Sequence, residues 1–213
     1  MPLLTMNRRF ALTAMAAAGV LGTLPAAAAE LPRDTSATAR QLVRWATETG
    51  DHQGLPFAVI DKPTARIHVF SAQGQWLSSA PVLLGAALGD RSASDIGQRP
   101  LSQIRPEERT TPAGRFVTEP GRNLRGDDIV WIDYESAVSL HRVRSVHAAE
   151  RRQQRLASRG VSDKRISYGC VNAPEAFYNQ FIAPVFGQAR GVVYVLPDTE
   201  SFATFFIAAS AYP

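Results

Sequence analysis

Between residues 56 and 197 the chain contains seven short apolar or alternating segments. Such segments predict strands, because successive side chains of a strand point to opposite faces of its sheet. They are FAVIDK (57–62), ARIHVFS (65–71), WLSSAPVLLG (76–85), GRFVTE (114–119), DIVWID (128–133), AVSLHRV (137–143) and GVVYVLP (191–197). The last is apolar throughout, which is typical of a buried strand. The sequence therefore predicts a single domain that is mainly β with a few helices.

Helical patterns are confined to a few places. Residues 34–48 predict a short helix that Asp34 caps and Gly50 ends. A second helix is expected from Pro174, a residue that suits the first helical turn. Its apolar side would carry Phe177, Phe181 and Val185.

The first 29 residues have the layout of a secretory signal peptide. Asn7-Arg8-Arg9 supplies a positive start, residues 11–24 are apolar and rich in alanine, and four alanines precede Glu30. The adjacent arginines resemble a twin-arginine export signal, with the ordinary secretory route as the open alternative. We therefore expect an exported protein of the periplasm or cell envelope, with no stable membrane span after processing.

The charge balance excludes one class of partner. The full chain has a formal net charge of +4. Removing residues 1–29 takes away Arg8 and Arg9 and no acidic residue, so the remainder is closer to neutral. Nucleic-acid binding depends on a strongly basic surface, so no nucleic-acid partner is expected.

Two long stretches interrupt the predicted strands. Residues 85–114 are rich in Gly, Ser, Arg and Pro, and connections of this length are usually lids, binding loops or disordered insertions. Residues 144–165 include the basic, helix-forming run AAERRQQRLASR (148–159). Two interpretations of this run stay open, namely a solvated helix face and a surface that holds an anionic envelope polymer.

Cys170 is the only cysteine of the chain, in the segment ISYGCVNAPEAFYNQF (166–181). An unpaired thiol in an exported protein is a candidate reactive group, although a buried structural cysteine is the commoner situation. If the helix from Pro174 begins directly after the turn, its N-terminus would favour the thiolate. Gly169 can adopt a backbone conformation that lets its amide and that of Cys170 point at an oxyanion.

A general base for this thiol must be one of four histidines. His52 and His68 are expected at the surface, the latter on the solvated side of a strand, and His147 is expected to be solvated at the start of the basic helix. His141 ends a predicted strand, where it can meet a turn from elsewhere in the fold. We therefore favour His141 as the base, with a structural histidine as the alternative.

These elements together resemble the L,D-transpeptidase catalytic domain (YkuD-type), whose signature is a histidine, a spacer, and Ser/Thr-His-Gly-Cys-x-Asn/Arg. Here His141 precedes the run Ser167-Tyr168-Gly169-Cys170-Val171-Asn172. The run TPAGRF (111–116) resembles a further element of the family, Thr-Pro-x-Gly-x-Phe. The resemblance implies a β-sandwich or barrel catalytic domain at 56–199, flanked by a helix and linker (30–55) and a C-terminal tail (200–213).

The resemblance also implies an activity and roles for residues. Cys170 would be the nucleophile and His141 its base, with a backbone carbonyl orienting the imidazole. Gly169 and Cys170 would supply oxyanion-hole amides, while Ser167 and Asn172 would brace the turn. The family attacks tetrapeptide stems of peptidoglycan at the L-centre of diaminopimelate, expels D-alanine, and needs neither metal nor organic cofactor.

Two departures from the family pattern leave other functions open. Tyr168 stands where the family has histidine, and a phenol does not shuttle protons readily near neutral pH. The spacer after His141 is also longer than usual. The alternatives are a catalytically impaired peptidoglycan-binding module on the same fold, and a thiol hydrolase or acyltransferase that acts on another envelope substrate.

Overall fold

The computed structural model describes residues 31–144 and 147–213. The predicted signal peptide at 1–29 lies outside the described residues and stays a prediction. Among the described helices, none combines the length and the apolar character that crossing a membrane requires.

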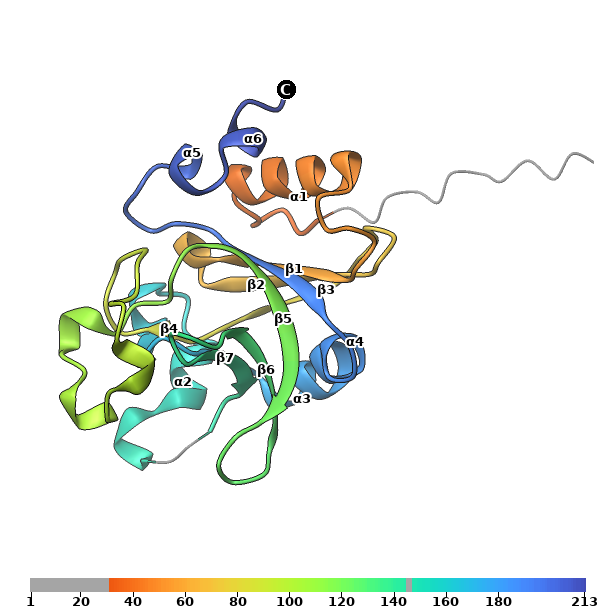
Figure 1. Ribbon diagram of the computed structural model, residues 1–213. Helices are drawn as coiled ribbons and strands as arrows, with labels where there is room; N and C mark the ends of the chain where they lie inside the picture. Colours follow the sequence, from red (N-terminus) through yellow and green to blue (C-terminus); the bar gives the residue numbers. More distant parts are fainter. Residues whose placement is uncertain (1–30, 145–146) are drawn as a thin grey trace, which may run out of the picture.

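An eight-stranded sheet, strongly curled in Figure 1, organises the molecule in the order β3-β2-β1-β10-β5-β6-β7-β9. Its strands are β1 (Phe57–Asp61), β2 (Arg66–Phe70), β3 (Trp76–Pro81), β5 (Gly114–Arg122), β6 (Asp128–Asp133), β7 (Val138–Arg142), β9 (Val171–Ala173) and β10 (Gly191–Val195). β1 with β10 and β7 with β9 are parallel pairs, and the other neighbours are antiparallel. A separate parallel pair joins β4 (Leu84–Gly85) to β8 (Arg165–Ser167). The prediction of a mainly β fold is confirmed, although the sequence did not predict β8 and β9.

Helices are few and mostly short. They are α1 (Ala37–Thr49), α2 (Arg152–Ala157), α3 (Glu175–Phe177), α4 (Ala183–Phe186), α5 (Phe202–Phe205) and α6 (Ile207–Ser210), with a π-helical turn at Tyr178–Ile182 between α3 and α4. The predicted cap of the first helix is wrong by two residues, since the hydroxyl of Ser36 accepts from the Ala39 amide at 3.0 Å. Asp34 instead pairs with Arg66. Gly50 ends α1 with a positive φ of 69°, a conformation that favours glycine.

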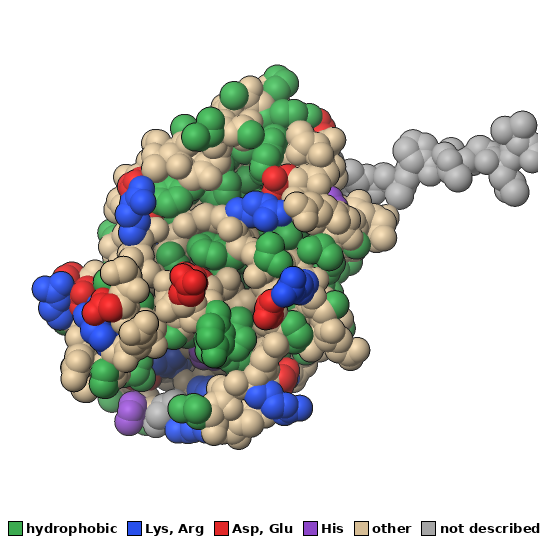
Figure 2. Space-filling model, in the orientation of Figure 1, with side chains coloured by type: hydrophobic (Ala, Val, Ile, Leu, Met, Phe, Trp, Pro, Cys, Tyr) green, Lys and Arg blue, Asp and Glu red, His purple; other side chains and the backbone are tan. Residues whose placement is uncertain are grey.

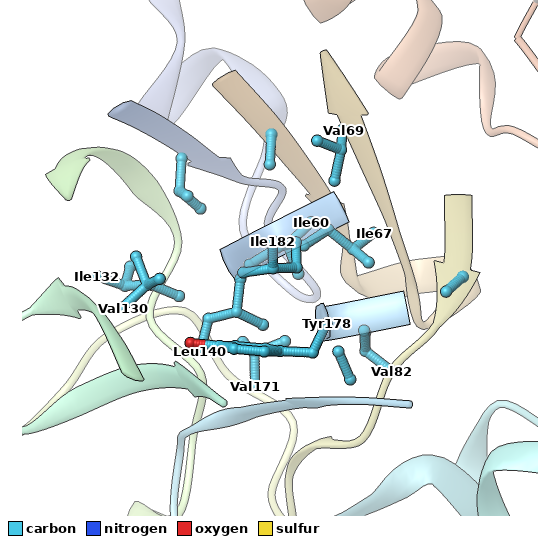
Figure 3. Packing of buried hydrophobic residues seen from close by; sticks show 14 of the residues in the cluster. Ile60, Ile67, Val69, Val82, Val130, Ile132, Leu140, Val171, Tyr178 and Ile182 are labelled. Atoms are coloured by element: carbon cyan, nitrogen blue, oxygen red, sulfur yellow. The ribbon is translucent and has the colours of Figure 1, made fainter. Parts of the chain in front are cut away.

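Two hydrophobic layers lie on opposite faces of the sheet. Along β1, Ala58 and Ile60 contribute to one layer, while Phe57 and Val59 contribute to the other. This alternation explains why β1 is buried along its whole length. The first layer lies inside the curl of the sheet and includes side chains of β7, β9 and the π-helical turn (Figure 3).

The second layer is covered by α1, α5 and α6, which lie together beyond β1 in Figure 1. Leu42 of α1 and Ala209 of α6 are fully buried in it. The Gln41 side chain also donates to the carbonyl of Ala209 at 3.1 Å. Segments 30–55 and 200–213, predicted as a helix with linker and as a tail, therefore contribute helices to the same packed body as the sheet.

The two long connections differ from each other. After β4, residues 85–114 contain only short 3-10 turns, as the absence of a strand pattern predicted. The basic run at 148–159 forms a shorter helix than predicted, since a 3-10 turn at Ala148–Glu150 precedes α2. On the face seen in Figure 2, basic and acidic side chains are interspersed and do not gather in one large basic patch.

Candidate active site

The site is built where two parallel strands end side by side. Leu140 of β7 pairs with Val171 of β9, and His141 pairs with Asn172. Leu140 and Val171 are fully buried in the first layer and anchor both strands (Figure 3). His141 directly follows Leu140, and Cys170 directly precedes Val171. Both candidate site residues are therefore held at the edge of this layer. A parallel pair requires a long crossover connection, which explains why the spacer between them is long.

Cys170 occupies the turn between β8 and β9, and its thiol is half-buried. Its Sγ atom lies 3.5 Å from the Ser139 amide nitrogen and 3.6 Å from the Ser139 hydroxyl. The predicted helix begins where it was expected, with Pro174 as the residue before α3, but β9 separates it from Cys170. On the neighbouring strand β7, Ser139 therefore contacts the sulfur through both its backbone amide and its hydroxyl.

The electrostatics of the thiol depend on His141. Burial raises the pKa of the Cys170 thiol, but a hydrogen bond from His141, the charge of that imidazole and hydrogen bonds from Ser139 outweigh burial, so the pKa is lowered. Burial lowers the pKa of His141, whereas its hydrogen bond to Cys170, the thiolate charge and the hydrogen bond to Arg142 leave it raised. The two shifts have one cause and favour a thiolate–imidazolium pair.

A backbone carbonyl orients the imidazole. Nδ1 of His141 lies 2.7 Å from the carbonyl oxygen of Arg142, so this nitrogen carries a proton and donates it. The other ring nitrogen, Nε2, lies 3.5 Å from the side-chain amide of Asn172 and is left to interact with the Cys170 thiol. The carbonyl occupies the place that a carboxylate has in a Ser-His-Asp arrangement.

Polar contacts fix the shape of the cysteine turn. The Ser167 hydroxyl donates to the carbonyl of Cys170 at 2.6 Å, and the Asn172 amide donates to the same carbonyl at 3.1 Å. Gly169 has a φ of 132°, and a Cβ at this position would lie 2.7 Å from the carbonyl oxygen of Thr110. The turn therefore requires glycine for both its conformation and its close contact.

The Gly169 amide is engaged within this turn. It donates to the Ser167 hydroxyl at 3.1 Å. An oxyanion-hole role for this amide stays a prediction, and it would require the amide to leave Ser167 when substrate binds.

Tyr168 projects beside the cysteine, with 38% of its surface exposed. The guanidinium of Arg109 lies 4.2 Å from the centre of its ring. This stacking places the Arg109 cation beside Tyr168, the position at which the family resemblance predicts histidine.

Residues outside the segment around Cys170 also support the turn. The Thr111 hydroxyl donates to the carbonyl of Gly169 at 2.8 Å, and the buried ammonium of Lys62 donates to the carbonyl of Thr111 at 2.6 Å. Lys62 also pairs with buried Asp90 at 2.8 Å. Thr111 was flagged by the TPAGRF motif, whereas no pattern in the sequence predicts a fully buried lysine after β1.

Arg152 links the basic segment to the site. Its guanidinium donates to Asn172 Oδ1 at 2.6 Å and to Glu150 at 2.6 Å. This bond orients the Asn172 side chain so that its NH₂ group faces the Cys170 carbonyl and His141. The interpretation of the basic run as a purely solvated face is therefore wrong for Arg152.

The other three histidines lie apart from these contacts. His68 is fully buried and contacts the Ser79 hydroxyl at 2.7 Å, so its predicted solvated position is wrong. His52 is also buried, with its Nδ1 atom 2.8 Å from the carbonyl of Leu55, contrary to the surface prediction. His147 is exposed, as predicted.

Within residues 31–144 and 147–213, no group of three His, Cys, Asp or Glu side chains is arranged to hold a metal ion. The chemistry that these residues can supply is that of a cysteine nucleophile with a histidine base.

Comparison with known proteins identifies a limited structural likeness. The structure is similar to that of the LD transpeptidase LdtMt1 in complex with imipenem, with 18% sequence identity and a TM-score of 0.37. The match covers 66% of this chain and 58% of that protein, so the chain spans less than two thirds of the length of its structural neighbour. No family model matches the sequence. No curated protein matches it either.

Fold and site together define a mainly β protein with a cysteine–histidine pair at the ends of two parallel strands.

Proposed function

We propose that the protein is a cysteine acyltransferase of the L,D-transpeptidase type, which acts on tetrapeptide stems of peptidoglycan in the cell envelope. The pairing of Cys170 with His141, in which the thiol pKa is lowered and the imidazole pKa is raised, carries this proposal. The resemblance of residues 141–172 to the family signature names the substrate class.

In the first half of the reaction, His141 holds the proton of the Cys170 thiol while Sγ attacks the carbonyl carbon at the L-centre of diaminopimelate. The carbonyl electrons move to its oxygen and return when the bond to D-alanine breaks. The imidazolium gives its proton to the leaving amine, and an acyl-enzyme remains on Cys170. An amine or water then attacks the thioester, passes its proton to His141 and releases the thiol.

The oxyanion of this reaction forms close to Sγ and needs hydrogen-bond donors. Because Gly169 donates to Ser167, the Cys170 amide and the Ser139 hydroxyl are the donors we propose. The Ser139 hydroxyl lies 3.6 Å from Sγ.

Release of D-alanine from tetrapeptide muropeptides tests the proposal. Purified protein is expected to release D-alanine and to form products that mass spectrometry identifies, and Cys170→Ala is expected to lower the rate at least about 10³-fold. Exposed Tyr134→Ala is the control, because this side chain lies on the surface at the turn after β6. D-Alanine release that is unchanged in Cys170→Ala would refute the mechanism.

Tyr168 favours a second candidate function, a peptidoglycan-binding module that has lost catalysis. Its phenol occupies the position at which the family has histidine, directly before Gly169. Binding of sacculi by a protein whose Cys170 is inert to carbapenems and to alkylating agents would favour this candidate over the enzyme.

A further inference from the structure

Arg109 is an unusual cation at the edge of the site. Its guanidinium stacks on Tyr168, which is two residues before the nucleophile. It donates one hydrogen bond, from Nη2 to the carbonyl of Ile104 at 3.3 Å, and its buried Nε atom has no partner among the described residues. A guanidinium has five N–H donors, so most of its hydrogen-bonding capacity is unused.

The other arginines of this connection are neutralised. Arg99 and Arg105 both pair with Glu108, at 3.0 and 3.1 Å. Arg91 stacks on Phe205 and binds Glu200 through two nitrogens, each at 2.8 Å. Within the part of the chain that the structure describes, Arg109 forms no ion pair with a carboxylate. It is therefore available to bind an anion.

The backbone holds Arg109 in place beside the cysteine turn. The Ala87 amide donates to the Arg109 carbonyl at 3.0 Å, and the Ala86 amide donates to the Ser167 carbonyl at 2.9 Å. On the other side, the Thr111 hydroxyl binds the Gly169 carbonyl. Segments 109–111 and 167–169 are thus fixed against one another, and the guanidinium and the tyrosine ring form one surface.

We propose that Arg109, supported by the ring of Tyr168, binds a carboxylate of the acyl donor beside Cys170. This inference rests on the proposed function and specifies its substrate as a peptide with a free carboxylate close to the scissile carbonyl. The planar guanidinium can bind a carboxylate through two parallel hydrogen bonds. Two carboxylates of a tetrapeptide stem fit this chemistry, that of the departing D-alanine and that of the diaminopimelate side chain.

Alkylation of Cys170 tests the effect of the Arg109 charge and does not require that the protein act on peptidoglycan. Because Cys170 is the only cysteine, its reaction with anionic iodoacetate or neutral iodoacetamide reports on this site alone. In the full chain, Arg109→Gln is expected to lower the ratio of the two rates about fivefold or more at low salt, since a nearby cation attracts only the anionic reagent. Arg91→Gln removes a stacked but neutralised arginine and is expected to change the ratio less than about twofold.

Tyr168→Leu provides a second variant if Arg109→Gln does not fold. This substitution removes the ring that supports the guanidinium but leaves its charge. The expected result is a smaller fall in the ratio, about twofold to threefold. A ratio that is equal in the wild type and in these variants, or that falls equally in Arg91→Gln, would overturn the inference.

Synthetic tetrapeptides then separate the two carboxylates. If the wild type cleaves them, Arg109→Gln is expected to lower kcat/KM about tenfold for the peptide with both carboxylates free. Amidation of the carboxylate that Arg109 binds should remove this difference, whereas amidation of the other should preserve it. A wild type that cleaves no peptide but shows the Arg109-dependent alkylation ratio would reject the proposed function and retain the anion site.

Discussion

Two histidines lie on strands of the same sheet, and their surroundings make them chemically opposite. His68 of β2 is fully buried, contacts the Ser79 hydroxyl, and has no hydrogen-bond partner for Nε2 among the described residues. His141 of β7 lies at a strand end, donates to a backbone carbonyl and faces a thiol. Burial disfavours the charged form of both imidazoles.

The negative charge of the Cys170 thiolate accounts for the difference in pKa between His68 and His141. Burial lowers the pKa of His68 to about 4, because the nearby carboxylates of Asp61 and Asp34 offset it only in part. The Cys170 thiolate reverses this effect at His141, whose pKa is raised. His68 is therefore a neutral core residue in spite of these carboxylates, whereas the hydrogen bond to Cys170 and the thiolate charge raise the pKa of His141.

The largest expected effect on activity is that of a substitution at His141. His141→Gln removes the imidazolium that stabilises the thiolate, and acyl transfer should fall about 10³-fold. The pH at which Cys170 alkylation is half-maximal should also rise, because burial of the thiol is no longer opposed. Rates measured against pH with iodoacetamide check this prediction. An unchanged inflection would show that His141 does not hold the thiolate.

His68 predicts a pH dependence of folding stability. Its pKa is lower in the folded protein than the ordinary 6.5, so the unfolded chain binds more protons between pH 6.5 and 4. The contribution is complete above pH 6.5 and is lost as pH falls toward 4, in total about 3 kcal/mol.

Urea unfolding of the wild type and of His68→Gln at pH 7, 6 and 5 measures this contribution of His68 to the free energy of unfolding. The wild type should lose stability relative to the variant as the pH falls. Parallel curves for the two proteins, or an NMR titration that places the His68 pKa near 6.5, would contradict the proposed contrast with His141.

A smaller effect on activity is expected from a substitution of Arg152. Arg152→Gln releases the Asn172 side chain, which contacts both His141 and the Cys170 carbonyl, and kcat should fall about tenfold. The positive charge of Arg152 also lowers the pKa of His141, so the variant should shift the pH profile of kcat upward.

The matched control is Arg155→Gln on the same helix. Arg155 donates only to the carbonyls of Glu150 and Asp163. This variant removes a charge of the same sign from the same helix without releasing Asn172, so it should leave kcat unchanged. An equal fall in kcat in both variants would mean that Arg152 acts through general charge and not through Asn172.

Local pattern predicted most strands but not how distant elements meet. All seven segments with apolar or alternating character contain strands of the sheet. β9 has only three residues and shows no alternation, and its pairing with β7 is a contact between segments far apart in sequence. For the same reason the sequence did not predict that β9 separates Cys170 from the helix that begins at Glu175.

The same limit explains the error at His68. It alternates with Ile67 and Val69, which suggested a solvated face. Its cross-strand partner Val59 belongs to the layer that α1 covers, so both faces of β2 are buried there. Alternation shows that two faces differ, but it does not show what packs on each of them. Motif spacing did identify Cys170, His141, Ser167 and Asn172, which the structure brings into one site.

In the proposed reaction, Cys170 forms the covalent acyl-enzyme intermediate. Intact-protein mass spectrometry during turnover of a tetrapeptide stem, followed by peptide mapping, tests it most directly. We expect a transient adduct equal in mass to the donor less D-alanine, located on the peptide that contains Cys170 and absent from Cys170→Ala. Product formation without any adduct on Cys170, at a rate that Cys170→Ala preserves, would contradict it.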